Sequence, residues 1–136
     1  MPNVQQIKTS VRGYNRLASP PQLLAAMGKL LKLRQGVLAA GGDQKRLVEL
    51  LAASLSTIMV IFRAVIRLHG GVPAKDNLAV SQALAAYTRV DAAPFERVVR
   101  HVRGDQAITP ADAGAVMAGY LGGMEALVAH LDRFGR

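Results

Sequence analysis

Apolar residues along the chain recur every three or four positions, in segments separated by glycine pairs and prolines. This spacing is typical of α-helices that bury one face, because about 3.6 residues complete a helical turn. No segment alternates apolar and polar residues as a half-buried strand does. The pattern predicts an all-α protein, with about five helices in a compact bundle.

The first predicted helix begins at Ser19-Pro20, with Ser19 as its N-cap and Pro20 at the first helical position, where a missing N–H costs nothing. It ends at Gly41-Gly42, since glycine tolerates the left-handed conformation that follows a helix. Its apolar residues predict a single helical face, formed by Leu23, Leu24, Met27, Leu30, Leu31, Leu33, Val37 and Leu38.

The second predicted helix is capped by Asp43 and runs to about His69 without a glycine or proline. Residues 59–61 make it apolar around most of its circumference, which predicts a central position. Its longest uncharged apolar stretch, Leu50 to Phe62, is shorter than the roughly 20 residues that a membrane-spanning helix needs. We therefore predict a long core helix and no contact with a membrane.

Three further helices are predicted after the second. A short third helix begins at Asp76 or Asn77, and Asp91 caps a fourth. The inward positions of the fourth are Phe95, Val98, Val99 and Val102. The last helix opens at Thr109-Pro110 with an acidic residue three positions after the threonine, close to a capping box. The third and fourth helices thus form a short helical hairpin before the last one.

Composition narrows the class of protein. The chain has 136 residues, 51% of them hydrophobic, no cysteine and a net charge of +8. It is too apolar to be disordered, and it has no disulfide framework, thiolate zinc site or cysteine nucleophile. We interpret residues 1–18, which lack periodicity, as a basic arm, and residues 19–136 as one domain.

The N-terminus has no apolar signal segment, so we expect a cytoplasmic location.

The positive charge is concentrated near the N-terminus. Residues 1–46 hold eight of the seventeen Lys and Arg residues but only one acidic residue. Lys29, Lys32 and Arg34 project from the other sides of the first helix, away from its apolar face. Such a one-sided basic segment is typical of contact with nucleic acid or an anionic partner. The alternative is a solvated helix face behind a solubilising tail.

Arg63 and Arg67 lie one turn apart on the apolar second helix. Two guanidinium groups so placed could clamp an anion such as phosphate. The alternative is that they pair with acidic residues (Glu49, Glu125 or Asp132) or extend to the surface.

Small residues recur every fourth position on the last helix, at Gly114, Ala118 and Gly122. Each interior glycine costs a helix about 0.5–1 kcal/mol relative to alanine. The presence of these glycines within a helix therefore requires a structural explanation. Small residues let another backbone approach closely. A parallel row follows one position later, at Ala115, Gly119 and Gly123. One explanation is tight packing against the second helix, and the other is the seam of a homodimer.

The sequence contains no recognisable motif of an enzyme active site, a cofactor site or a metal site. It contains no nucleophile elbow, P-loop or dinucleotide-binding glycine motif, and its three histidines lack metal-ligand spacing. We therefore predict no catalytic residue, no metal and no cofactor. The segment Ala83 to Arg100 resembles a helix-turn-helix, but Arg89 replaces the usual turn glycine and Pro94 lies where base-reading side chains should be. A helical hairpin in a bundle produces the same pattern.

Four runs, GKLLKLRQGVLAA, LLAASLSTIMVIFRAVIRLHGGVPA, VDAAPFERVVR and YLGGMEALVAHLDRF, lie between Gly28 and Phe134. They resemble the C-terminal helical region of bacterial nucleotidyltransferase-like proteins, whose catalytic domain is of the polymerase-β type. The Gly-Ser pair and Asp-x-Asp of that catalytic domain are absent here, so no catalytic residue carries over. The resemblance implies a non-catalytic accessory domain that assembles with itself or with a nucleotidyltransferase-like partner. The alternative is nucleic-acid binding by the basic arm and first helix.

Overall fold

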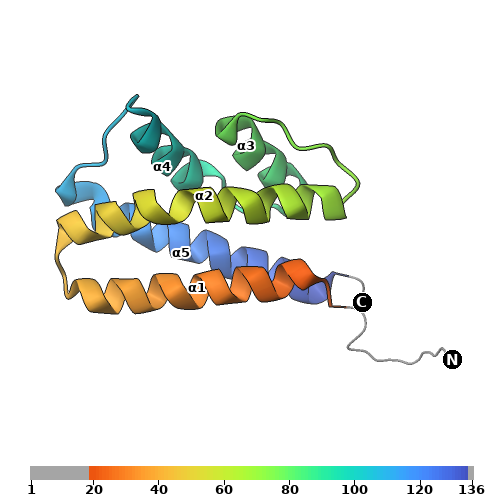
Figure 1. Ribbon diagram of the computed structural model, residues 1–136, viewed down its shortest axis with the longest axis horizontal. Helices are drawn as coiled ribbons and strands as arrows, with labels where there is room; N and C mark the ends of the chain where they lie inside the picture. The colour runs from red at the N-terminus through yellow and green to blue at the C-terminus, as the bar shows by residue number, and fades with distance from the viewer. Residues whose placement is uncertain (1–18, 135–136) are drawn as a thin grey trace, which may run out of the picture.

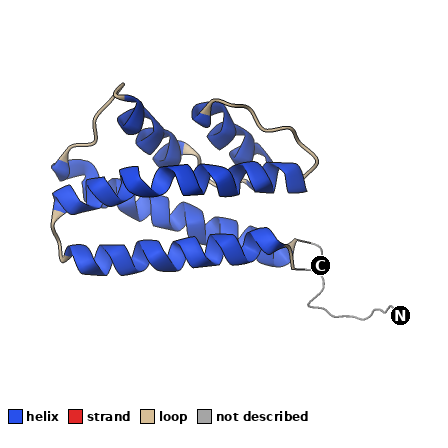
Figure 2. Ribbon diagram, viewed as in Figure 1, coloured by secondary structure: helices blue, strands red, loops and turns tan. Residues whose placement is uncertain are grey.

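The computed structural model describes residues 19–134, and these fold into five α-helices with no strand among them (Figure 2). The predicted all-α class, the number of helices and the long second helix are confirmed. The predicted arm, residues 1–18, lies outside the described residues. The helices are α1 (Pro21–Ala40), α2 (Gln44–Leu68), α3 (Asn77–Thr88), α4 (Ala93–Arg103) and α5 (Pro110–Arg133).

Three long helices form the base of the bundle. α1, α2 and α5 all pack against one another, with α1 running opposite to the other two (Figure 1). The short hairpin of α3 and α4 lies on α2, on the side away from α1 (Figure 1). Within residues 19–134, α1 therefore packs mainly against α2 and α5, and no helix of this range covers the side of α1 that points away from them.

Three aromatic rings join α2, α4 and α5 in the core. Phe62 and Phe95 meet edge to face with their ring centroids 4.9 Å apart, and the Tyr120 ring lies 4.9 Å from that of Phe95. The Tyr120 hydroxyl and the Ser54 Oγ share a hydrogen bond of 3.0 Å, so this buried polar group has a partner. Burial raises the pKa of Tyr120 well above its ordinary value, and the hydroxyl stays protonated.

Three predicted helix starts are confirmed. Asp43, Asp76 and Thr109 are the N-caps of α2, α3 and α5, and their side chains accept hydrogen bonds of 3.0–3.3 Å from first-turn N–H groups. These bonds satisfy donors that have no partner inside the helix. The Thr109 hydroxyl also bonds the Asp112 carboxylate at 3.0 Å.

Two predicted starts need correction. The N-cap of α1 is Pro20, not Ser19, because a residue before a proline is pushed out of the helical region and Pro21 follows it. Pro20 accordingly has an extended backbone with ψ 149°. The N-cap of α4 is Ala92, not Asp91, although the Asp91 carboxylate does accept a 3.0 Å bond from the Ala93 N–H.

The fourth helix is amphipathic, as predicted, except at its end. Phe95, Val98 and Val99 are buried, but Val102 is exposed. Val102 lies in the last turn, where α4 runs past the core toward the loop that leads to α5. The predicted inward face is therefore correct for three of its four positions.

α2 is the core helix of the bundle, as predicted. It buries residues in every turn from Leu51 to Ile66. By length and composition it is the one helix between residues 19 and 134 that could cross a membrane, but half of its most apolar window is buried by the other helices.

Candidate functional site

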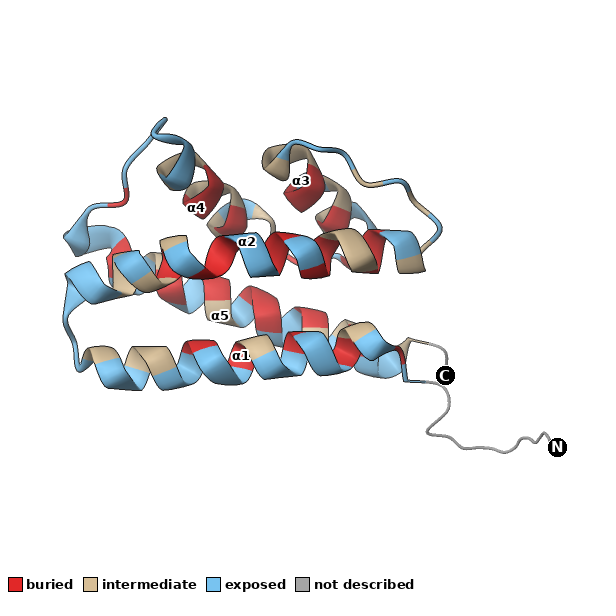
Figure 3. Cartoon of the chain, in the orientation of Figure 1, coloured by how far each residue is buried: buried red, intermediate tan, exposed pale blue. Residues whose placement is uncertain are grey.

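The apolar residues of α1 form one wide face, and only part of it is buried. Leu23, Ala26, Leu30 and Leu33 face the bundle and are buried. Leu24, Met27, Leu31 and Leu38, along one edge of this face, are exposed, and Figure 3 shows α1 exposed along much of its length. We call these four residues the outer α1 face. The predicted apolar face is therefore only partly buried against the bundle.

The outer α1 face has the spacing of a helix–helix seam. Leu24, Leu31 and Leu38 are seven residues apart, which places them two turns apart on almost the same line. Their side chains are 73%, 56% and 82% exposed, and Met27 is 48% exposed. Single exposed apolar residues are ordinary on protein surfaces, but a contiguous row of them marks an interaction site.

A groove runs beside this face, between α1 and α2. It has a volume of about 490 Å³, and its lining is mostly apolar. A Cβ atom added at Gly28 would have no heavy atom within 4 Å, so the groove is open there. The residues that line it are Leu24, Ala25, Gly28, Lys29, Lys32, Thr57, Val60 and Ile61.

Lys29 and Lys32, two of the predicted cationic residues, lie in this groove. Burial, and secondarily the charge of Lys32, lowers the pKa of Lys29. Neither lysine makes an ion pair with any residue between 19 and 134. The groove therefore combines apolar walls with two ammonium groups that have no carboxylate beside them.

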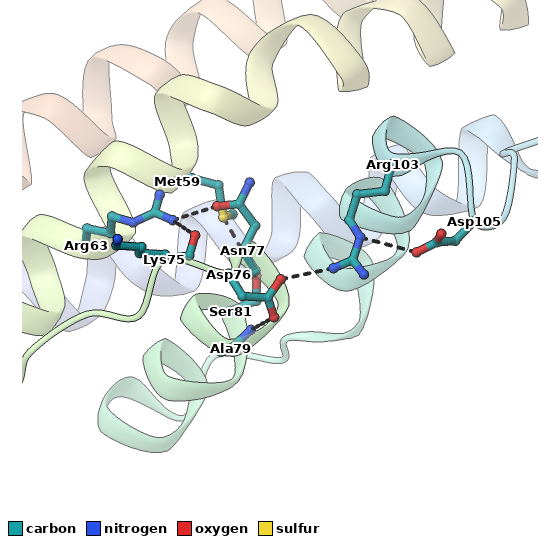
Figure 4. Close-up of polar contacts among 9 residues, drawn as sticks. All are labelled: Met59, Arg63, Lys75, Asp76, Asn77, Ala79, Ser81, Arg103 and Asp105. Atoms are coloured by element: carbon teal, nitrogen blue, oxygen red, sulfur yellow. Dashed lines mark hydrogen bonds and ion pairs between the residues drawn. The ribbon is translucent and has the colours of Figure 1, made fainter.

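The other three predicted cations lie elsewhere. Arg34 forms an ion pair with Glu125 of α5, which holds α1 to the bundle. Arg63 donates to the carbonyl of Lys75 at 2.7 Å and to the Asn77 side chain at 2.8 Å (Figure 4). It also donates to the carbonyl of Ala74 at 3.3 Å. Arg67 is exposed in the last turn of α2. The five candidates do not converge on one site.

Arginines also fix the loops around α3 and α4. Arg103 bridges Asp76, the N-cap of α3, and Asp105, at 3.0 and 3.2 Å (Figure 4). Arg97 donates to the carbonyls of Gln106 and Ala107 at 2.9 and 3.0 Å. These two cations satisfy backbone carbonyls and a cap, so their positions need no ligand to explain them.

The two small-residue rows of α5 have different surroundings. Gly119 and Gly123 face α4, where an added Cβ at Gly123 would overlap the Phe95 ring and lie 2.7 Å from its Cζ. Gly114, Ala118 and Gly122 are exposed, and Cβ atoms at the two glycines would meet nothing within 4 Å. Tight packing against α2, one of the two explanations of the row Gly114, Ala118 and Gly122, is therefore wrong. The homodimer seam through it remains a prediction.

The α3–α4 turn contains one residue in the left-handed region. Arg89 has φ 65°, the conformation in which side chains other than glycine are strained. The segment is a packed helical hairpin, and Pro94 at the start of α4 lies against Gly119 of α5. The first turn of α4 therefore faces the bundle, where a DNA-reading helix would need it free.

We expect Arg89→Gly to raise the free energy of unfolding by about 0.5–1 kcal/mol, because glycine removes the left-handed strain and part of this gain is lost to the more flexible unfolded chain. Arg89→Ala is the matched control, since it removes the side chain but keeps the strain. Urea unfolding of both variants checks this. Equal stability of the two would contradict the explanation.

Sequence reasoning missed a histidine pair at the end of the bundle that holds the C-termini of α2 and α5. The Nε2 atoms of His69 and His130 are 3.0 Å apart, and the His69 ring stacks on Tyr87 and meets the edge of Phe134. Histidines 61 positions apart carry no sequence signal of this contact. No group of three metal-ligating side chains occurs within residues 19–134.

The free energy of unfolding should fall at acidic pH because of this histidine pair. Burial, then the charges of His69 and Arg133, lowers the pKa of His130 below its ordinary 6.5. The unfolded chain therefore takes up this proton first, and stability declines as pH drops below about 6.5 until the folded-state pKa is passed. Urea midpoints at about pH 7.5 and pH 5 measure the decline, which His130→Gln should reduce. An unchanged decline in this variant would exclude His130 as its source.

The third histidine has a structural role. His101 Nδ1 accepts a 2.9 Å hydrogen bond from the Ile108 N–H, which fixes the loop between α4 and α5. This contact requires the proton on Nε2 when the ring is neutral.

Comparison with known proteins yields no relative: no family model matches the chain, and no curated protein or solved structure shows significant similarity to it.

Proposed function

We propose that this protein is a non-catalytic helical interaction domain, and that the outer α1 face is where it docks a partner. The observation that supports this most directly is the exposed leucine row at seven-residue spacing. Leu24, Leu31 and Leu38 are not among the residues of the buried core, to which α1 contributes its other apolar residues. The sequence resemblance makes a nucleotidyltransferase-like protein one candidate partner.

Burial of these side chains could drive docking. Fully burying a leucine contributes about 1.5–3 kcal/mol through the hydrophobic effect. Helix-in-groove recognition uses apolar anchors at this spacing, and it needs a neighbouring hollow of the kind that lies between α1 and α2. The proposed role therefore requires only surfaces that the described residues provide.

A synthetic helix can test the proposal. We expect a peptide with leucine at heptad positions a and d, and glutamine at the flanking positions, to bind the full-length protein. The double variant L24E/L31E should lose at least about tenfold in affinity, since it places charge in an apolar seam. Fluorescence anisotropy of the labelled peptide measures this.

Val72→Glu is the matched control, because Val72 is 95% exposed and lies outside α1. Both variants change exposed residues, so circular dichroism should show unchanged helicity. Failure of the glutamine peptide to bind, or equal binding by wild type and L24E/L31E, would contradict the proposed function.

A further inference from the structure

We propose that His69 and His130 form a binding site for a soft monovalent transition-metal ion of the Cu(I) class, held in a line between their Nε2 atoms. The proposal goes beyond the docking function and involves no residue of the outer α1 face. It departs from the sequence-based expectation of no metal, which rested on histidine spacing within single helices. His69 is the C-cap of α2, and His130 lies in the last turn of α5.

The two imidazole rings meet head to head. Their Nε2 atoms are 3.0 Å apart, and their ring centroids are 5.1 Å apart with the planes inclined by 30°. This centroid distance is close to the distance between the nitrogens plus the radii of the two rings, so both nitrogens lie near the line that joins the ring centres. The free position of a ring nitrogen points outward in the plane of its ring. The two Nε2 atoms therefore face a common position between them.

This position suits a single cation. Two N–H groups or two lone pairs placed face to face repel each other, so the neutral pair holds one proton between its nitrogens. A metal ion can replace that proton, because a neutral imidazole nitrogen is the commonest metal ligand in proteins. Metal–nitrogen bonds are about 2 Å long, so a linear ion requires the nitrogens to separate by about 1 Å. Both rings are half-buried at helix ends, where small side-chain rotations can provide this separation.

Neighbouring groups hold the His69 ring in place. The Tyr87 ring of α3 stacks on it with the centroids 5.1 Å apart, and the Phe134 ring meets its edge at 5.0 Å. The His69 N–H donates to the carbonyls of Val65 and Ile66 at 3.1 Å, which fixes the backbone. A ligand that is already held near its binding geometry loses little conformational freedom when the ion binds.

The number of ligands and the local charge select the kind of ion. No group of three or more His, Cys, Asp or Glu side chains that could hold an ion occurs in the described part of the chain. Zn²⁺ sites in proteins use three or four protein ligands, whereas Cu(I) and Ag(I) form linear complexes with two nitrogen ligands. Arg133 lies close enough to His130 for its positive charge to act on that ring. This repulsion is larger for a divalent ion than for a monovalent one.

Titration with Cu(I) under anaerobic reducing conditions, or with Ag(I) in air, tests the proposal. We expect one equivalent to bind the full-length protein and to shift the Nε2 resonances of His69 and His130 in ¹H–¹⁵N spectra of the histidine rings. The ring of His101 is the internal control, because its Nδ1 bonds the Ile108 N–H and it is not part of the pair. This readout needs no variant, so it holds even where a substitution disturbs folding.

Variants then separate the two ligands from the background. His69→Gln and His130→Gln should each lower the affinity for Cu(I) at least about tenfold in competition with a chromogenic chelator. His130→Met should retain most of the affinity, since a thioether also binds Cu(I), and His101→Gln is the matched control. Unshifted Nε2 resonances, or equal affinity of wild type and His130→Gln, would overturn the site. Tighter binding of Zn²⁺ or Ni²⁺ than of Cu(I) would overturn the two-coordinate ion.

Discussion

Replacing Phe95 with alanine is expected to lower the free energy of unfolding by about 3–5 kcal/mol, the usual cost of deleting a buried aromatic side chain. Phe95 is fully buried on α4, and its ring contacts both Phe62 of α2 and Tyr120 of α5. The short helix α4 has few other anchors. Loss of this ring therefore leaves a cavity where three helices meet.

Urea unfolding followed by circular dichroism measures this effect. Val102→Ala is the control, because Val102 lies on the same helix and is 52% exposed. Its stability should stay within about 0.5 kcal/mol of wild type. If Phe95→Ala lowered the free energy of unfolding by no more than about 0.5 kcal/mol, α4 would contribute little to the stability of the core.

Most of the fold follows from local sequence. The helical period, the prolines and the capping side chains of Asp43, Asp76 and Thr109 specify where three of the five helices begin, and the structure agrees. The central position of α2 also follows, because a helix that is apolar around most of its circumference must be covered on several sides. These features depend on neighbours within one or two turns.

The docking surface could not be assigned in the same way. The apolar residues of α1 cover about half of its circumference, and the helical period does not show which part of this face is buried. That depends on where α2 and α5 lie. The seven-residue spacing of Leu24, Leu31 and Leu38 was visible in the sequence, but nothing local marks this row as the exposed edge of the face.

The roles of the cations depend on contacts that are distant in sequence. Arg34 meets Glu125 across 91 positions, and Arg63 binds loop carbonyls whose path no pattern predicts. Both were candidates for ligand binding on charge alone. Once these internal contacts are known, Lys29 and Lys32 are the pair in the groove between α1 and α2.

The adjacent glycines of α5 show how local pattern and tertiary packing diverge. Gly122 and Gly123 look equivalent in sequence, yet Gly122 is exposed and Gly123 is buried against Phe95. An added Cβ at Gly123 would lie 2.7 Å from the Phe95 Cζ, whereas one at Gly122 meets nothing within 4 Å. The same substitution at the two positions should therefore have opposite effects.

We expect Gly123→Ala to lower the free energy of unfolding by about 1–3 kcal/mol, since the rigid ring cannot move away without disturbing Phe62 and Tyr120. Gly122→Ala should raise it by about 0.5–1 kcal/mol, the gain in helix propensity. Replacing Phe95 by leucine removes the ring, so Gly123→Ala should cost less in that background. Urea unfolding of the four variants gives this coupling directly, and an equal cost of Gly123→Ala in both backgrounds would show that Phe95 is not what requires a glycine there.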